Sequence, residues 1–196
     1  MKIWQPLVLL CAAASCAGRD NPPSDDLPSR RGVTAERADT CWRATPELVR
    51  LKEPALYEVA PSADTEAVRF LWFPTFHGTV SVRLVRRGET YALVSTRLSP
   101  DSDTAVVTRR DSLRITAARW AELTAPLRTD AFWSPEPRPE GGVRIDGSTW
   151  RVEATLQGAC RAVEYWSPEV AGRGADVLAF GTRMLDAAGI VPEMIY

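Results

Sequence analysis

A chain of 196 residues, of which 45% are hydrophobic and 25% charged, has the length and composition of one folded domain with extensions. These proportions exclude a fibrous repeat and disorder along the whole chain. The formal net charge is -1, and the 24 basic residues are interspersed with 25 acidic residues, so we expect no nucleic-acid partner.

The first 15 residues are organised like a bacterial export signal. Lys2 and the amino terminus form a positive region, and the apolar run from Leu7 to Ala14 is too short to span a bilayer. The tetrad AASC, which ends at Cys16, resembles the bacterial lipobox, in which the cysteine is acylated on sulfur and becomes the first mature residue. Ala13 departs from the aliphatic residue that usually opens this motif.

We therefore expect residues 1–15 to be a lipoprotein signal peptide and Cys16 to be the lipidated residue. Two or three acyl chains on one residue hold a protein at a membrane, so the predicted location is the bacterial cell envelope. Ala17 in place of aspartate is similar to lipoproteins sorted to an outer membrane, where the cell has one. An ordinary signal peptide cut after Ala14 or Ala17 is the alternative and would give a periplasmic or secreted protein.

Residues 16–40 are expected to form a disordered tether. After the cysteine, the stretch AGRDNPPSDDLPSRRGVTAERADT contains three prolines, many charges and no aromatic residue. Such a composition buries too little apolar surface to become ordered. We interpret it as a flexible connection between the membrane and the domain.

Residues 41–196 are predicted to form a single α+β domain, an antiparallel sheet with about two packed helices. A short helical entry spans about Pro46 to Leu51, and the segment from Pro54 to Pro61 is predicted to be a loop or sheet edge. Alternating apolar and polar residues predict four strands, namely Glu66–Phe73, Gly78–Gly88, Thr90–Leu98 and about Ala105–Ile115.

The second of these strands illustrates the predicted faces of the sheet. Val80, Val82 and Leu84 share one face, and Ser81 and Arg83 share the other. An antiparallel sheet often has one face in water, so the arginines of these strands are expected to be solvated.

Two helices are predicted to cover the apolar face. The first begins after Thr116 as N-cap and is ended or kinked by Pro126, with Trp120, Leu123 and Leu127 at helical spacing. An exposed loop follows at Ser134–Gly142. The last helix, from about Ala175 to Ala188, is expected to bury Val177, Leu178, Met184 and Leu185 and to stop at Gly189.

Between these helices, the dipeptide Gln157-Gly158 favours a two-residue hairpin turn. Counting outward from the turn, apolar residues meet on one face: Leu156 with Ala159, Val152 with Val163, and Trp150 with Tyr165. On the other face Arg151 meets Glu164, which is an opposite-charge pair, and Cys160 lies opposite Thr155.

Cys41 and Cys160 are the two cysteines that remain after acylation, and in an oxidising envelope we expect them to form a disulfide bond. Their bridge would fasten the start of the domain across the back of the sheet. A metal site is not expected, because the chain has no C-x-x-C motif and His77 is its only histidine. A catalytic thiol that uses His77 is poorly motivated.

Three stretches, RFLWFPTFH, DGSTWRVE and EYWSPE, resemble in order and spacing a set of uncharacterised bacterial secreted proteins and lipoproteins of unknown function. The likeness extends over roughly Arg69 to Gly189. It implies an α+β fold and an envelope location, and it carries over no catalytic residue.

Other candidate chemistry is weakly indicated. A Ser/His/Asp site would have to use His77, which follows Phe76 beside a strand, where a packed histidine is far commoner. The pair Asp101 and Asp103 lacks the other ligands of a calcium loop, and the Gly172-Arg173-Gly174 stretch lacks the parallel strand of an anion site. Five tryptophans are candidates for a platform that stacks on sugar or peptide, but packing against the sheet explains them more simply: Trp72, Trp120, Trp133, Trp150 and Trp166.

The sequence thus predicts a non-enzymatic envelope lipoprotein, anchored to the membrane by lipid, that binds a protein or a cell-wall partner. No cofactor, no metal and no catalytic residue is expected, and no ligand-binding residue is assigned. The alternative is a small envelope hydrolase that uses His77.

Overall fold

The computed structural model describes residues 45–99, 107–133, 146–168 and 174–191. They form one six-stranded antiparallel sheet with helices, which confirms the α+β class. The predicted signal peptide, the tether, Cys41 and the loop Ser134–Gly142 lie outside the described residues. In chain order the elements are α2 (Pro46–Arg50), α3 (Leu56–Val59), β1 (Thr65–Pro74), β2 (Val80–Arg87), β3 (Thr90–Leu98), β4 (Val107–Arg114), α4 (Ala117–Thr124), the 3-10 turns η1 (Ala125–Arg128) and η2 (Asp130–Trp133), β5 (Ser148–Leu156), β6 (Ala159–Trp166) and α5 (Ala175–Ala187).

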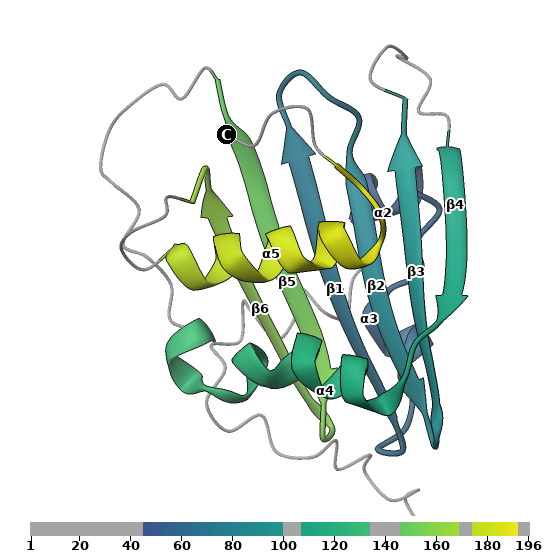
Figure 1. Cartoon of the computed structure of the whole chain (residues 1–196). Coiled ribbons are helices and arrows are strands. Elements are labelled where there is room, and N and C mark those ends of the chain that lie inside the picture. Colours follow the sequence, from purple (N-terminus) through teal and green to yellow (C-terminus); the bar gives the residue numbers. More distant parts are fainter. Residues whose placement is uncertain (1–44, 100–106, 134–145, 169–173, 192–196) are drawn as a thin grey trace, which may run out of the picture.

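The strands lie in the order β4-β3-β2-β1-β5-β6 (Figure 1). The first four strands form a meander in which each strand pairs with the next one along the chain. The chain then passes through α4, η1 and η2 and returns as β5 on the other side of β1. The first strand of the sequence is therefore a central strand, hydrogen-bonded to β2 and β5.

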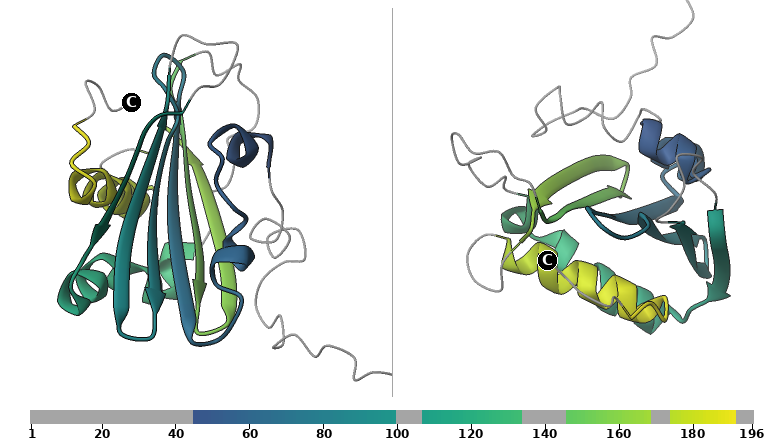
Figure 2. Two further views of the ribbon diagram at one scale, coloured as in Figure 1. Left: turned by 90° about the vertical axis from the view of Figure 1, so that its right-hand side faces the viewer. Right: turned by 90° about the horizontal axis from the view of Figure 1, so that it is seen from above.

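Helices α4 and α5 cover one face of the sheet, here called the front face (Figures 1 and 2). The main hydrophobic core lies between these helices and the strands. At its centre, Trp150 is fully buried, and its ring centroid lies 5.2 Å from that of Phe70. The Trp150 Nε1 donates a hydrogen bond of 2.7 Å to Ser148 Oγ, so the buried indole N–H is satisfied.

The N-terminal segment, residues 45–60, covers the opposite or back face with α2 and α3 (Figure 2). Leu48 and Leu51 pack against Leu71 and Leu98 in one small cluster. A second cluster joins α3 to the sheet and contains Leu56, Val59, Ala60 and Ala67. The sheet is thus covered on both faces around β1, and nearly every residue of β1 is buried.

The hairpin of β5 and β6 has the predicted register. Leu156 pairs with Ala159, Arg151 with Glu164 and Thr155 with Cys160, as counted from the turn at Gln157-Gly158. Gln157 and Gly158 both have positive φ, of 52° and 74°, as a type I′ turn requires. The observed pairing confirms the predicted register. Turn chemistry and side-chain pattern both specify this register, which is why it could be predicted.

The four strands β1 to β4, the entry helix and the two front-face helices are also confirmed, with small differences at their ends. Thr116 caps α4 by accepting a hydrogen bond of 3.1 Å from Arg119 N, and α5 is followed by Gly189 at φ 64°. Leu178 is only half-buried, whereas Phe180 faces the core.

Two predictions about the back face were wrong. Ser81 is buried instead of solvated, and Arg83 keeps only 12% of its side chain exposed, because the N-terminal segment lies over them. The segment Pro54–Pro61, expected to be a loop or edge, contains the short helix α3. Glu58 stabilises the start of α3 by accepting a hydrogen bond of 2.9 Å from Ala55 N.

Strand β4 forms one edge of the described sheet, and most of its side chains are exposed. Its sequence, VTRRDSLR, is rich in charge, and the side chain of Arg109 is 70% exposed. Leu113 is the large apolar side chain that this strand leaves exposed.

Gly181 on α5 allows the helix to approach the aromatic core. A Cβ at this position would lie 2.4 Å from an atom of Trp150 and 2.6 Å from one of Phe70. We predict that Gly181→Ala lowers the free energy of unfolding by about 1 to 2 kcal/mol, because overpacking outweighs the higher helix propensity of alanine. Urea denaturation measures this loss, and the exposed Arg183→Ala on the same helix should change stability by less than about 0.5 kcal/mol. An unchanged or raised stability in Gly181→Ala would show that the core yields at no cost.

Candidate functional site

His77 follows β1 and lies beside a core tryptophan. Its ring centroid is 6.4 Å from that of Trp72, with the planes tilted by 36°. Neither of the two pockets described below has His77 in its wall.

The tryptophans are used for packing. Four of the five that were considered for a stacking platform are buried, and Trp166 is half-buried. Trp72 and Trp150 lie 6.3 Å apart in the front-face core, and Trp120 packs beside Tyr91 at 5.9 Å. A platform built from Trp72, Trp120, Trp133 and Trp150 is therefore excluded, and the simpler interpretation is confirmed.

Of the residues predicted to carry covalent chemistry, Cys160 alone is described. It lies on β6, is 9% exposed, and pairs with Thr155, which in turn pairs with Ala67 of β1. Ala67 packs against α3, so Cys160 is on the back face, the same face that the N-terminal segment covers. Cys16 and Cys41 lie outside the described residues, as do Asp101, Asp103, Gly172 and Arg173.

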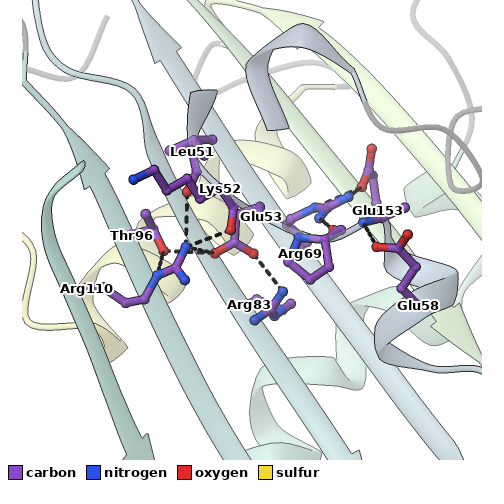
Figure 3. Close-up of polar contacts among 11 residues, drawn as sticks. Leu51, Lys52, Glu53, Glu58, Arg69, Arg83, Thr96, Arg110 and Glu153 are labelled. Atoms are coloured by element: carbon purple, nitrogen blue, oxygen red, sulfur yellow. Dashed lines mark hydrogen bonds and ion pairs between the residues drawn. The ribbon is translucent and has the colours of Figure 1, made fainter. Parts of the chain in front are cut away.

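The back face contains a cluster of charged side chains that the sequence did not suggest. We call it the back-face ion network, and its members are Glu53, Arg69, Arg83, Arg110, Arg151 and Glu153. Figure 3 shows the contacts of Glu53, Arg69, Arg83, Arg110 and Glu153. Glu53 comes from the N-terminal segment, and the other members come from four different strands. The network therefore joins the N-terminal segment to the sheet.

Glu53 makes the contacts between the segment and β2, β3 and β4. Its Oε2 lies 2.7 Å from Arg83 Nη1, and its Oε1 accepts a hydrogen bond of 2.8 Å from Thr96 Oγ1. Arg110 of β4 approaches the same carboxylate at 3.6 Å. Arg110 Nη2 also donates to the carbonyl oxygens of Leu51 and Lys52, at 3.0 and 2.9 Å. The segment is thus bound through both a side chain and its backbone.

Arg69 and Glu153 form the most deeply buried pair of the network. Both side chains are 0% exposed, and Arg69 Nε donates a hydrogen bond of 3.0 Å to Glu153 Oε2. Arg69 Nη1 donates a second hydrogen bond of 2.6 Å to the carbonyl oxygen of Pro54. Arg151 Nη2 lies 2.7 Å from the other oxygen of Glu153. A buried charge needs such partners, because an unpaired one is strongly destabilising.

Arginines outnumber carboxylates in this network, and the consequence is visible at Arg83. Burial lowers the pKa of Arg83; Glu53 raises it, whereas the nearby Arg69 and Arg110 lower it again. Arginine nevertheless stays protonated in proteins and cannot act as a general base. The network is suited to holding the segment in place and not to proton transfer.

A pocket of about 200 Å³ lies at the turn end of the β5–β6 hairpin, and we call it the hairpin pocket. Its walls come from η1, η2 and the hairpin: Leu127, Arg128, Trp133, Ala154, Leu156, Gln157, Ala159 and Arg161. A second hollow of about 10 Å³, beside Arg97 and Arg109, has room for no more than about one water molecule.

The sequence explains why the hairpin pocket is hollow. Near the turn, this face of the hairpin carries the small residues Ala154 and Ala159. Further from the turn, the same face carries larger residues such as Val152 and Val163. Trp133 is fixed as a wall, because its Nε1 donates a hydrogen bond of 2.8 Å to the carbonyl oxygen of Leu127. The pocket therefore combines apolar walls with arginine side chains.

Comparison with known proteins gives no family: no family model and no curated protein matches the chain. Within the described ranges, no helix is long and apolar enough to cross a bilayer. In that same part of the chain, no three His, Cys, Asp or Glu side chains are grouped so that they could hold a metal ion.

We predict that Glu53→Gln lowers the free energy of unfolding by about 3 kcal/mol, because Arg83 is left buried without its counter-charge. Glutamine keeps the size of the side chain and an oxygen that accepts from Thr96, so the effect reports on charge. The control is Glu122→Gln, which removes an exposed ion pair with Arg119 and should cost less than about 1 kcal/mol. Urea denaturation compares the two variants, and equal losses would contradict the role given to the network.

Proposed function

We propose that this chain is a lipid-anchored protein of the bacterial cell envelope whose folded domain binds a protein or cell-wall partner without catalysing a reaction. The export signal, the lipobox-like tetrad ending at Cys16 and the tether of residues 16–40 support the anchoring. The binding role is supported by the structure of the domain.

The observation that carries the binding role is the chemistry of the hairpin pocket. Its described wall contains apolar residues, one glutamine and two arginines, and among these wall residues there is no nucleophile and no group that could act as a general base at neutral pH. Apolar walls with a few polar groups are typical of binding sites. The proposal therefore assigns recognition to this pocket.

The arrangement of the domain suits attachment through its N-terminus. The tether leads into the N-terminal segment, which packs on the back face and is held there by the back-face ion network. The hairpin pocket is built from front-face side chains, including Ala154 and Arg161, together with η1 and η2. The attachment and the proposed binding site thus use opposite faces of the sheet.

Lipid anchoring is tested with Cys16→Ser in a bacterial cell. We expect the wild-type chain to carry acyl mass in intact mass spectrometry and to sediment with membranes, and the variant to lose both properties. Cys11→Ser is the matched control and should leave both unchanged. An unacylated wild-type chain that begins at its first residue would refute the proposed anchor.

A disulfide bond between Cys41 and Cys160 is part of the same proposal. The position of Cys160, on the face of the sheet that the N-terminal segment covers, supports it. Closing a loop of more than 100 residues stabilises a domain by about 4 to 5 kcal/mol in the chain-entropy model.

We predict that Cys41→Ala lowers the free energy of unfolding by about 4 kcal/mol. A reducing agent should destabilise the wild type by a similar amount and should not destabilise the variant, which has no bridge to lose. This variant leaves β6 untouched, so the change reports on the bridge alone. Urea denaturation with and without reductant makes the measurement. Peptide mapping without reduction provides an independent check, and alkylation of Cys160 in the native protein would contradict the bridge.

A further inference from the structure

The hairpin pocket has room for one ring-sized apolar group. A cavity of about 150 Å³ lined by apolar side chains accommodates benzene, and this pocket measures about 200 Å³. Pockets for drug-sized ligands and cofactors usually start at about 300 Å³. The volume therefore selects a small group such as a single side chain.

Positive charge stands beside these apolar walls. Arg128 of η1 is exposed, and the side chain of Arg161 on β6 is 38% exposed. Arg161 Nη1 donates a hydrogen bond of 2.6 Å to Asp130 Oδ1, and the Asp130 side chain is 92% exposed. An exposed pair of this kind contributes little to stability, so an incoming carboxylate is able to take the place of Asp130. Arginine is able to bind a carboxylate with two parallel hydrogen bonds, and Arg161 already binds that of Asp130, so a carboxylate is the anion that suits this site.

The walls are fixed before any ligand arrives. Trp133 is held by its hydrogen bond to the carbonyl oxygen of Leu127. At the turn, Gln157 N donates a hydrogen bond of 3.1 Å to Glu66 Oε1, which ties the tip of the hairpin to β1. A preformed pocket loses little freedom on binding and so retains more of the interaction free energy.

We infer that the hairpin pocket binds a carboxylate that carries one apolar group, with the apolar group between Trp133 and Leu156 and the carboxylate at Arg161 and Arg128. This inference deepens the proposed function, on which it rests, by naming the chemistry that the pocket recognises. A free aromatic or branched-chain acid presents that chemistry, and so does the last residue of a peptide chain.

Three probes separate these sources and test the carboxylate. The probes are 3-phenylpropionate for a free acid, N-acetyl-phenylalanine for a chain end, and N-acetyl-phenylalanine amide, which has the same apolar group and no carboxylate. Each is titrated into the mature chain carrying Cys16→Ser, and binding is followed by the NMR shifts of the backbone amides of Gln157 and Ala159. We expect at least one acid to bind and the amide to bind roughly tenfold more weakly.

Two substitutions of exposed side chains give opposite expected effects. Arg161→Gln should weaken binding of the acid roughly tenfold, because it removes the guanidinium that receives the carboxylate. Asp130→Asn should strengthen binding about threefold, because it removes the competing carboxylate from Arg161. Arg114→Gln, on the exposed edge strand β4, is the matched control and should change nothing. Ala159→Leu fills the pocket from an exposed position and should abolish binding.

The inference is overturned if the amide binds as well as the acids, if no acid shifts Gln157 or Ala159, or if Asp130→Asn weakens binding. Those results would leave the acyl mass on Cys16 and membrane sedimentation unaffected. An unacylated wild-type chain, which would refute the proposed anchor, would conversely leave the measured affinities of the pocket unchanged. The two proposals therefore fail separately.

Discussion

The ion pair between Arg69 and Glu153 is the interaction around which the rest of the structure is arranged. Arg69 sits in the middle of the central strand with no exposed side-chain surface. Such a charge is tolerated inside a protein only when partners surround it, and here they come from β5 and from the carbonyl oxygen of Pro54. The N-terminal segment must therefore lie across the back face, where it both supplies that carbonyl and keeps water away from the pair. Glu53, one residue earlier, fastens the same segment to β2, β3 and β4.

Much of the sheet was predictable from local sequence. The β5–β6 register followed from a two-residue turn, matched apolar residues and the opposite charges of Arg151 and Glu164, which all agree with one pairing. Strands β1 to β4 and the cap at Thr116 followed from alternation and from capping chemistry in the same way. These features depend on residues close together in the chain, where periodicity and turn type are informative.

The coverage of the back face was not predictable in this way. Alternation in β2 correctly placed Ser81 and Arg83 on one face, but it does not say whether another segment covers that face. Glu53 lies 30 positions before Arg83 in the sequence and pairs with it only in the folded chain. Arginines on strands are typical of a solvated surface, so the burial of Arg69, Arg83 and Arg151 had no signal apart from the carboxylates spaced far along the chain.

The hairpin pocket escaped prediction for a related reason. It lies between the turns η1 and η2 and the β5–β6 hairpin, and a hollow of this kind depends on the sizes of side chains that meet only in three dimensions. A weak hint was present in the sequence, because Ala154 and Ala159 interrupt a run of larger core residues near the turn. The two alanines indicate a pocket only when the position of Trp133 is known, and the hairpin register alone does not give that position.

Strand β4 has a consequence for how molecules of this protein meet one another. An unpaired sheet edge offers a row of backbone donors and acceptors to which the strand of another chain is able to add. On β4 an added copy would bring a second set of Arg109, Arg110 and Arg114 close to the first and would strip water from them. The charge of these guanidinium groups, offset only in part by Asp111 beside Arg109, disfavours pairing of two copies through this edge even where many domains are crowded together.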